Sequence, residues 1–123
     1  MKKPPFHNSV HFTIKGLMWI LRNERNFQFH IFGLIINLFL IVFLGLSNTE
    51  TALIILCCFF VLTTEAVNTC IEKICDYIQP EFDINIGIIK DLAGGAVLLS
   101  VIVSLFVGIL VYWPYLNQKI SEF

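Results

Sequence analysis

The sequence changes character within Thr63-Thr-Glu-Ala-Val-Asn-Thr-Cys-Ile-Glu-Lys-Ile-Cys-Asp76, which directly follows an apolar run from Ala52 to Leu62. Polar side chains recur in this stretch at positions i, i+3, i+7 and i+11, namely Glu65, Asn68, Glu72 and Asp76. At about 100° per residue they share one face of a helix, in a stripe roughly 16 Å long. Because the preceding run is too apolar for a surface helix, we expect Glu65 at or just inside a membrane boundary, where an ionisable side chain is a functional candidate.

The composition is that of a membrane protein. Of the 123 residues, 57% are hydrophobic and only 14% are charged, whereas a soluble domain has about 25% charged residues. The length allows one small domain, which we take to be residues 1–123. We expect no nucleic acid among the partners, and the formal net charge of −1 says nothing further about them.

Hydrophobic patterning predicts an all-α membrane protein with a surface helix and three transmembrane helices. Residues 8 to about 27 carry an apolar stripe opposite a basic face, which is typical of an amphipathic helix lying in the membrane interface. The spans are expected at about residues 29–46, 51–78 and 86–113, with a tight polar connection at 47–50. The loop 79–87 is expected to be flexible at Gly87, and Pro114 is expected to end the last helix.

Polar, small and aromatic residues in the spans have expected roles of their own. Asn37, near the middle of the first span, is expected to make an interhelical hydrogen bond. His30 lies at the interface, and we expect no catalytic role for it. The small residues Ala93-Gly-Gly-Ala96 permit a close approach between helices. An aromatic belt at the far interface is expected from Tyr112, Trp113 and Tyr115.

Glu24 departs from the pattern of the amphipathic helix. On a helical wheel it falls beside the apolar stripe, about 20° from Leu17, and away from the basic face. A carboxylate held against apolar surface needs a partner, either a cation or a metal ion. Equally, the helix could fray there so that the wheel no longer applies, or Glu24 could pair locally with Arg25 or a nearby lysine.

Basic residues predict the orientation in the membrane. All but Lys119 fall on one side of a three-span protein: Lys2, Lys3, Lys15, Arg22, Arg25, Lys73 and Lys90. By the positive-inside rule this side, with the N-terminus, faces the cytoplasm. The acids Glu24, Glu72, Asp76 and Asp91 are then expected near one and the same membrane face.

Several carboxylates and an amide at one membrane face suit a divalent cation, and Mg²⁺ commonly binds one or two carboxylates together with substrate phosphates. Phosphoryl transfer also needs a base for the attacking hydroxyl, a role open to Glu65, and a cation at the phosphates, a role open to Lys90. The chain has neither a G-x-x-x-x-G-K-[ST] loop nor a kinase-type glycine-rich loop. A proton or ion pathway and a purely structural helix bundle therefore remain open as alternatives.

Three elements of the sequence carry a family resemblance. They are Asn23-Glu-Arg-Asn-Phe27, Glu65-Ala-Val-Asn-Thr-Cys-Ile-Glu72 with Asp76, and Lys90-Asp-Leu-Ala-Gly-Gly-Ala-Val-Leu98. They resemble the signatures of the small bacterial integral-membrane lipid kinases, the prokaryotic diacylglycerol kinase and undecaprenol kinase family. The resemblance extends from residue 9 to residue 113. It implies a homotrimer in the bacterial inner membrane that transfers the γ-phosphate of Mg-ATP to a lipid hydroxyl at the cytoplasmic interface.

The resemblance also implies roles for individual residues. Glu65 matches the general base, and Glu24 and Glu72 match the acids that hold the metal ion near the nucleotide. The residues that match the lining of the nucleotide and phosphate site are Asn68, Asp76, Lys90 and Asp91. Phe12 matches an aromatic near the adenine. The loop Pro80-Glu-Phe-Asp-Ile84 resembles the family's Pro-Glu-Tyr-His-Pro, which would bring Glu81 and Asp83 to the nucleotide, although Phe82, Asp83 and Ile84 are substitutions.

Two of these elements bear on the lipid substrate. Asn23-Glu-Arg-Asn-Phe27 and Asp91-Leu-Ala-Gly-Gly-Ala-Val-Leu-Leu99 are more similar to the undecaprenol kinase branch than to the enterobacterial diacylglycerol kinases. The latter more often have Asn-Glu-Ala-Ala-Phe and Asp-Met-Gly-Ser. The resemblance therefore implies undecaprenol as the acceptor, with diacylglycerol as the alternative.

Overall fold

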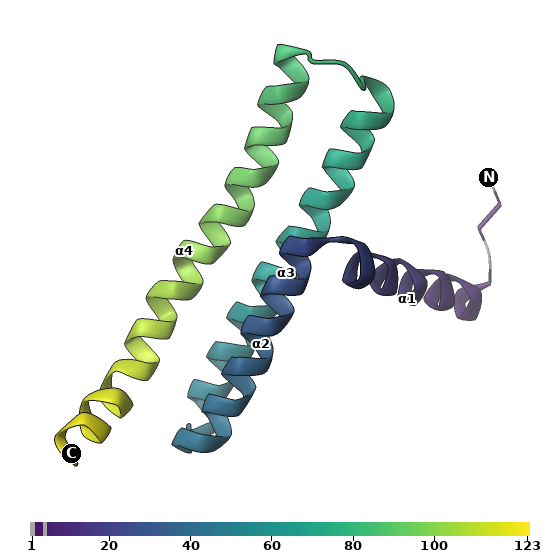
Figure 1. The fold of residues 1–123 in the computed structure, drawn as a ribbon. Coiled ribbons are helices and arrows are strands. Elements are labelled where there is room, and N and C mark those ends of the chain that lie inside the picture. Colours follow the sequence, from purple (N-terminus) through teal and green to yellow (C-terminus); the bar gives the residue numbers. More distant parts are fainter. Residues whose placement is uncertain (1, 4) are drawn as a thin grey trace.

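The computed structural model describes residues 2–3 and 5–123, and in these residues it is entirely helical apart from short connections (Figure 1). The helices are α1 (Phe6–Asn23), α2 (Arg25–Leu44), α3 (Asn48–Ile78) and α4 (Ile84–Ser121). Helix α3 packs against both α2 and α4, and the three run side by side. Helix α1 leaves the top of α2 crosswise, at about the middle of α3 (Figure 1).

Helices α2, α3 and α4 are each long and apolar enough to cross a membrane. Their outward-facing side chains are largely apolar and exposed, as at Phe39 and Val42 on α2 and Phe106 on α4. Such a surface needs a hydrocarbon solvent or further protein against it. The expected all-α architecture with three spanning helices is therefore confirmed.

The length of α3 places its polar half beyond the apolar layer. At 1.5 Å per residue its 31 residues extend about 45 Å, whereas the hydrocarbon core of a bilayer is about 30 Å thick. Helix α1 branches off at the level where this excess begins, and the upper parts of α3 and α4 continue past it (Figure 1). The fold thus sets apart a protruding α3–α4 hairpin that contains the stretch after Glu65.

The surface helix expected over residues 8 to about 27 ends earlier, at Asn23. Glu24 has an extended backbone (φ −104°, ψ 114°), and Arg25 begins α2. The physical reason lies in Gln28, whose side-chain Nε2 donates to the carbonyl oxygens of Leu21 (3.0 Å) and Arg22 (3.3 Å). These carbonyls have lost their helical partners, so the first turn of α2 satisfies the end of α1 and fixes the corner between them.

The connection between α2 and α3 is shorter than expected. Gly45 ends α2 in the left-handed conformation (φ 67°), which glycine adopts without steric cost. Ser47 then caps α3: Glu50 N donates to Ser47 Oγ, and Ser47 N donates to Glu50 Oε1. This reciprocal pair is a capping box, and it starts the helix at Asn48 within the predicted polar connection.

Two predictions about the last helix were wrong. Gly87 is not a flexible point, because Asp83 accepts from the backbone N–H groups of Asn85 (2.9 Å) and Ile86 (3.1 Å) and so starts α4 at Ile84. Pro114 does not end α4 either, since the helix continues to Ser121. Proline is tolerated in membrane helices where neighbouring helices support the chain, and α4 is bonded to its neighbours on both sides of Pro114.

Those supporting bonds join α4 to the other two spans. Tyr112 Oη donates to Asn37 Oδ1 of α2 (2.7 Å), and Tyr115 Oη donates to Glu50 Oε1 of α3 (2.5 Å). The interhelical hydrogen bond expected for Asn37 is therefore confirmed. The close approach that Ala93–Ala96 permits is not made through its glycines within this chain, because a Cβ added at Gly94 or Gly95 would meet nothing within 4 Å.

A small apolar cluster fixes the junction of α1, α2 and α3. It consists of buried Ile20, Phe27 and Leu62, against which Leu21, Ile31, Leu34 and Ala66 pack. Further along α3, the ammonium group of Lys73 lies 4.2 Å from the centroid of the Trp19 ring, a cation–π contact between α3 and α1. Together these contacts hold the α1–α2 corner, and with it Glu24, against α3.

Candidate active site

The polar stripe of α3 runs from buried to exposed. Glu65 is 4% exposed and Asn68 is 7% exposed, while Glu72 is half-buried and Asp76 is exposed. A carboxylate as deeply buried as Glu65 is costly to place in a protein unless it is paired or hydrogen-bonded. The stripe therefore combines a deep, enclosed carboxylate with an outer pair of carboxylates that solvent can reach.

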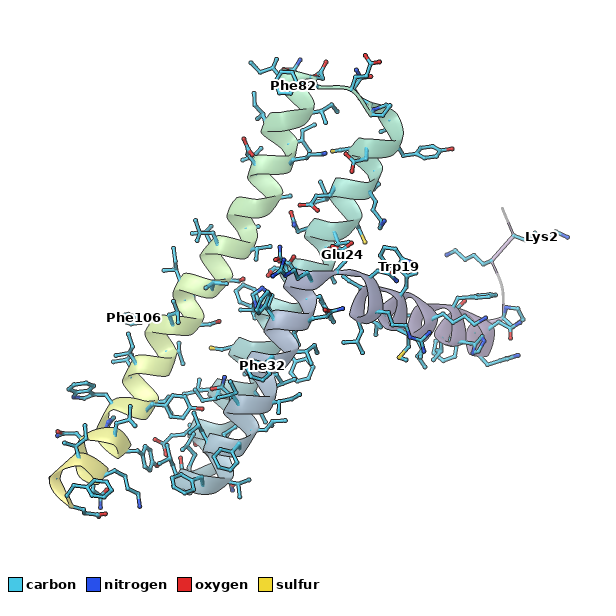
Figure 2. All side chains as sticks on the ribbon, viewed as in Figure 1. Lys2, Trp19, Glu24, Phe32, Phe82 and Phe106 are labelled. Carbon is cyan, nitrogen blue, oxygen red and sulfur yellow. The ribbon has the colours of Figure 1, made fainter. Side chains whose placement is uncertain are left out.

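Glu24 lies at the corner between α1 and α2, facing the middle of α3 (Figure 2). It and Glu72 are both near enough to Glu65 for their charges to act on that carboxyl group. Within the described residues Glu24 makes no ion pair, and the neighbouring Arg25 instead lies over the ring of Phe29 (5.7 Å). Of the alternatives for Glu24, the helix end is the one observed, because the helical wheel does not apply at an extended residue.

Glu65 has a neighbour that the sequence analysis did not assign to the site. His30 of α2 places its Nε2 atom 3.8 Å from Glu65 Oε2. The Asn26 side chain, one turn earlier on α2, also lies beside this carboxylate. A histidine at the start of an apolar span, in helical register with the buried Phe27, was the signal that could have indicated it.

Asn68 connects the deep and outer parts of the stripe. Its Nδ2 donates to Glu72 Oε1 (3.0 Å), which turns its Oδ1 away from that carboxylate. Asn68 Oδ1 is buried and has no hydrogen-bond partner in the described part of the chain. An acceptor left in this state costs about 1–3 kcal/mol. A donor or a cation from outside the chain would relieve that cost.

These oxygen atoms suit a magnesium ion. Mg²⁺ prefers oxygen ligands and usually keeps several waters, with one or two carboxylates and substrate phosphates completing its shell. Glu72 and Glu24 supply carboxylates, and Asn68 Oδ1 supplies an unpartnered oxygen beside Glu72. No group of three or more His, Cys, Asp or Glu side chains gathers as a metal site among residues 2–3 and 5–123. Glu24, Asn68 and Glu72 offer oxygen atoms of the kind that Mg²⁺ accepts together with phosphates.

On the α4 side, Lys90 is paired with the outer end of the stripe. Its Nζ makes a hydrogen-bonded ion pair with Asp76 Oδ1. Lys90 is half-buried and Asp76 is exposed, and the next residue, Asp91, is exposed as well. The fold therefore joins Asp76 of α3 to Lys90 of α4 and leaves the carboxylate of Asp91 in solvent.

Three other predicted site residues lie elsewhere. Phe12 is 57% exposed on α1, and Glu81 is exposed in the α3–α4 loop. Asp83 serves as the N-cap of α4 and already accepts two backbone N–H groups. The loop residue Phe82 is at the far end of the α3–α4 hairpin, well away from Glu24 (Figure 2). Within one chain, the nucleotide residues proposed for α1 and for the loop do not meet at Glu65.

An apolar groove begins beside the deep carboxylate. It has a volume of about 440 Å³, lies between α2, α3 and α4, and is open on one side. His30 contributes to its lining, as do Asn37 and Tyr112, whose polar atoms bond to each other. The remaining lining is largely aliphatic and aromatic, with Leu34, Ile54 and Val101 among its members. The groove thus runs along the spans from the neighbourhood of Glu65.

Comparison with known proteins places this geometry in a family. A model of the prokaryotic diacylglycerol kinase family matches residues 11–112. The chain is also 32% identical over 111 residues to the undecaprenol kinase of Bacillus subtilis (strain 168), an alignment that covers 90% of this chain and 89% of the relative. Both matches include Glu24, the whole acid stripe and Lys90. The chain therefore belongs to the prokaryotic diacylglycerol kinase family, and it is a lipid kinase.

Proposed function

We propose that this lipid kinase transfers the γ-phosphate of Mg-ATP directly to the hydroxyl of a membrane lipid alcohol, with undecaprenol as the preferred acceptor. The observation that carries the proposal is the deep burial of Glu65 in a helix long enough to cross a membrane, next to an unpartnered oxygen of Asn68. A lipid hydroxyl can reach such a position from the bilayer, and the outer stripe faces the water from which ATP comes.

Glu65 is the general base in this proposal. It accepts the proton of the lipid hydroxyl while the hydroxyl oxygen attacks the γ-phosphorus and the bond to the β-phosphate oxygen breaks. The proton thus goes to Glu65 and the electron pair to ADP. Burial of Glu65 keeps bulk water, a competing acceptor for the phosphoryl group, away from the base.

Glu24 and Glu72 hold the metal ion in this proposal. Bound there, Mg²⁺ would offset negative charge on the phosphates. Asn68 Oδ1 lies beside Glu72 and can accept from a donor or join the metal ligands, which would satisfy an otherwise orphaned atom. Asp76, Lys90 and Asp91 extend the site toward the aqueous side, where the Lys90 ammonium can exchange its Asp76 partner for a phosphate oxygen.

The remaining residues proposed to contact the nucleotide would reach it only after subunits assemble. We propose a homotrimer in which Phe12, Glu81 and Asp83 meet nucleotide at sites shared between subunits. The exposure of Phe12 and Glu81 supports this, as does the distance within one chain between the loop residue Phe82 and Glu24 (Figure 2). So does the open surface at Gly94 and Gly95, where another helix could approach closely.

The placement in the membrane follows the same proposal. Helix α1 lies in the interface as an amphipathic helix, with the N-terminus and the protruding α3–α4 hairpin in the cytoplasm of a bacterial cell. The crosswise direction of α1 relative to α2 supports this placement (Figure 1). The concentration of Lys and Arg on this side supports the proposed orientation, since cytoplasmic segments carry the excess of basic residues.

Undecaprenol is preferred to diacylglycerol because the Bacillus subtilis relative is named as an undecaprenol kinase. The apolar groove beside His30 fits the hydrocarbon part of either lipid. The test is a side-by-side assay of purified protein with Mg-ATP and either undecaprenol or diacylglycerol. We expect phosphorylated undecaprenol to form faster. Faster formation of phosphatidic acid would reverse the assignment, and failure with both lipids would overturn it.

A further inference from the structure

The imidazole ring of His30, on α2, lies close to the proposed base Glu65. His30 Nε2 lies 3.8 Å from Glu65 Oε2, and the side chains differ sharply in exposure, at 27% for His30 and 5% for Glu65. His30 therefore sits between the buried carboxylate and the apolar groove that it helps to line. A lipid that reached Glu65 along this groove would pass His30.

The apolar cluster at the junction of α1, α2 and α3 fixes the backbone that carries His30. His30 follows Phe27 by three residues and precedes Ile31, while Glu65 follows Leu62 by three residues and precedes Ala66. Phe27, Leu62, Ile31 and Ala66 all belong to the cluster that packs α2 against α3. His30 and Glu65 are thus each flanked by cluster residues within one helical turn, so the packing of α2 against α3 brings the imidazole close to the carboxylate.

Other groups around Glu65 do not provide the same support. Glu24 and Glu72 carry charge of the same sign and repel a carboxylate. Asn26 is an exposed amide at the side of Glu65, and Thr69 uses its hydroxyl on the Glu65 backbone oxygen (3.1 Å) and not on the carboxylate. A buried carboxylate that must accept a proton in one direction needs a fixed partner on another side. Among the described residues, His30 lies beside the carboxylate on the side of the groove, and Asn26 lies within hydrogen-bonding reach of it on the exposed side.

We propose that His30 is a positioning residue for Glu65. Its Nε2 holds the Glu65 carboxylate in one orientation, so that the lipid hydroxyl arriving along the groove meets a base that is already aligned. This inference rests on the proposed role of Glu65 as the general base. It gives His30 a function in the reaction, where the sequence had suggested none.

The test is a set of His30 variants assayed with the preferred lipid and Mg-ATP. His30→Phe retains the ring but has no nitrogen, and His30→Ala leaves a space of imidazole size. His30→Gln retains an N–H near the position of Nε2. We expect kcat to fall on the order of 10- to 100-fold in the Phe and Ala variants, as for a misaligned catalytic group, with the KM for ATP unchanged. The Gln variant should keep clearly more activity than the Phe variant.

Added imidazole tests for a role beyond packing, because a kcat lowered by loss of packing alone would not recover when imidazole is added. It should restore part of the kcat of His30→Ala and leave His30→Phe unaffected, because the phenyl ring fills the space. His7→Ala, at an exposed position on α1, is the matched control and should equal the wild type with or without imidazole. Size-exclusion profiles and helical content of each variant confirm that the compared proteins are folded.

Two results would overturn the inference. One is a wild-type kcat in both His30→Ala and His30→Phe. The other is an equal loss in the Ala, Phe and Gln variants that imidazole does not relieve, which would assign His30 to packing. Glu65→Gln measured in the same series separates the two proposals: activity in that variant removes the base role itself, whereas an inactive Glu65→Gln beside fully active His30 variants rejects the positioning role alone.

Discussion

Helix α3 carries a glutamate near each end of its membrane segment, and the two are treated differently by the fold. Glu50 accepts the backbone N–H of Ser47 (3.0 Å) and the hydroxyl of Tyr115 (2.5 Å). Glu65 has the His30 imidazole at 3.8 Å and shares its surroundings with an unpartnered Asn68 oxygen. Glu50 finds its partners within the chain, whereas one buried oxygen near Glu65, Asn68 Oδ1, has no partner among the described residues.

This difference separates structural from functional polar groups more clearly than residue type does. Native proteins satisfy nearly all buried polar atoms, so an exception calls for an explanation. At Glu50 the hydrogen bonds start a helix and join α3 to α4. Near Glu65 the exception, Asn68 Oδ1, lies where a lipid hydroxyl, a metal ion and phosphates are proposed to bind. The following predictions test whether the two ends differ in this way.

The largest difference is expected between Glu65→Gln and Glu50→Gln. Glu65→Gln removes the proposed base and should lower kcat by about 10²–10⁴-fold, with the helical content unchanged. Glu50→Gln keeps an acceptor oxygen for Ser47 and Tyr115 and should retain turnover. Lipid phosphorylation rates of the two purified variants make the comparison. Similar activities in the two variants would contradict the assignment of a catalytic role to Glu65 and a structural role to Glu50.

The next effect is expected in the metal dependence. Glu24→Gln and Glu72→Gln each remove one proposed Mg²⁺ carboxylate and should raise the Mg²⁺ concentration for half-maximal activity by about 10- to 100-fold. Removal of Mg²⁺ by a chelator should stop turnover in the wild type. Glu50→Gln again serves as the control. A Mg²⁺ titration that is the same in all four proteins would rule out these metal ligands.

A smaller effect, on stability, is expected at the other end of the bundle. Tyr112→Phe deletes the hydrogen bond to Asn37 between α4 and α2 and should cost about 0.6 kcal/mol, the average measured for such bonds within membranes, and no more than about 1.7 kcal/mol. Unfolding in detergent micelles monitored by circular dichroism provides the measurement. Combination with Asn37→Leu should add less than the sum of the single effects; full additivity would mean that the two side chains do not interact.

The smallest effect is expected for Tyr115→Phe. Its hydroxyl bonds to Glu50, but the Ser47 N–H remains on that carboxylate, so the capping box survives. The unfolding midpoint should fall by less than in Tyr112→Phe, because this bond joins α4 to α3 at the solvated end of the bundle, whereas the Tyr112 bond lies deeper among the spans. A larger drop than in Tyr112→Phe would contradict this order. It would show that the Tyr115–Glu50 bond contributes more to stability than the Tyr112–Asn37 bond.

Much of the molecule could be predicted from local patterns. The acid stripe, the three spanning helices and the interhelical bond of Asn37 all follow from periodicity and polarity along a single helix. Two of the failures have a common cause. The end of α1 at Asn23 depends on Gln28, and the passage of α4 through Pro114 accompanies bonds from Asn37 and Glu50. Each is decided by a side chain on another element, which propensity does not include.

The site shows the same division. The order Glu65, Asn68, Glu72, Asp76 is a property of the sequence, because a helix converts spacing directly into a shared face. The place of Glu24 beside α3, the pairing of Lys90 with Asp76 and the approach of His30 to Glu65 come from contacts between helices. The sequence by itself therefore determined the row of acids and the membrane helix that bears it. Only the tertiary structure decided which side chains face that row, because the register between packed helices is set by the apolar cluster and not by any one helix.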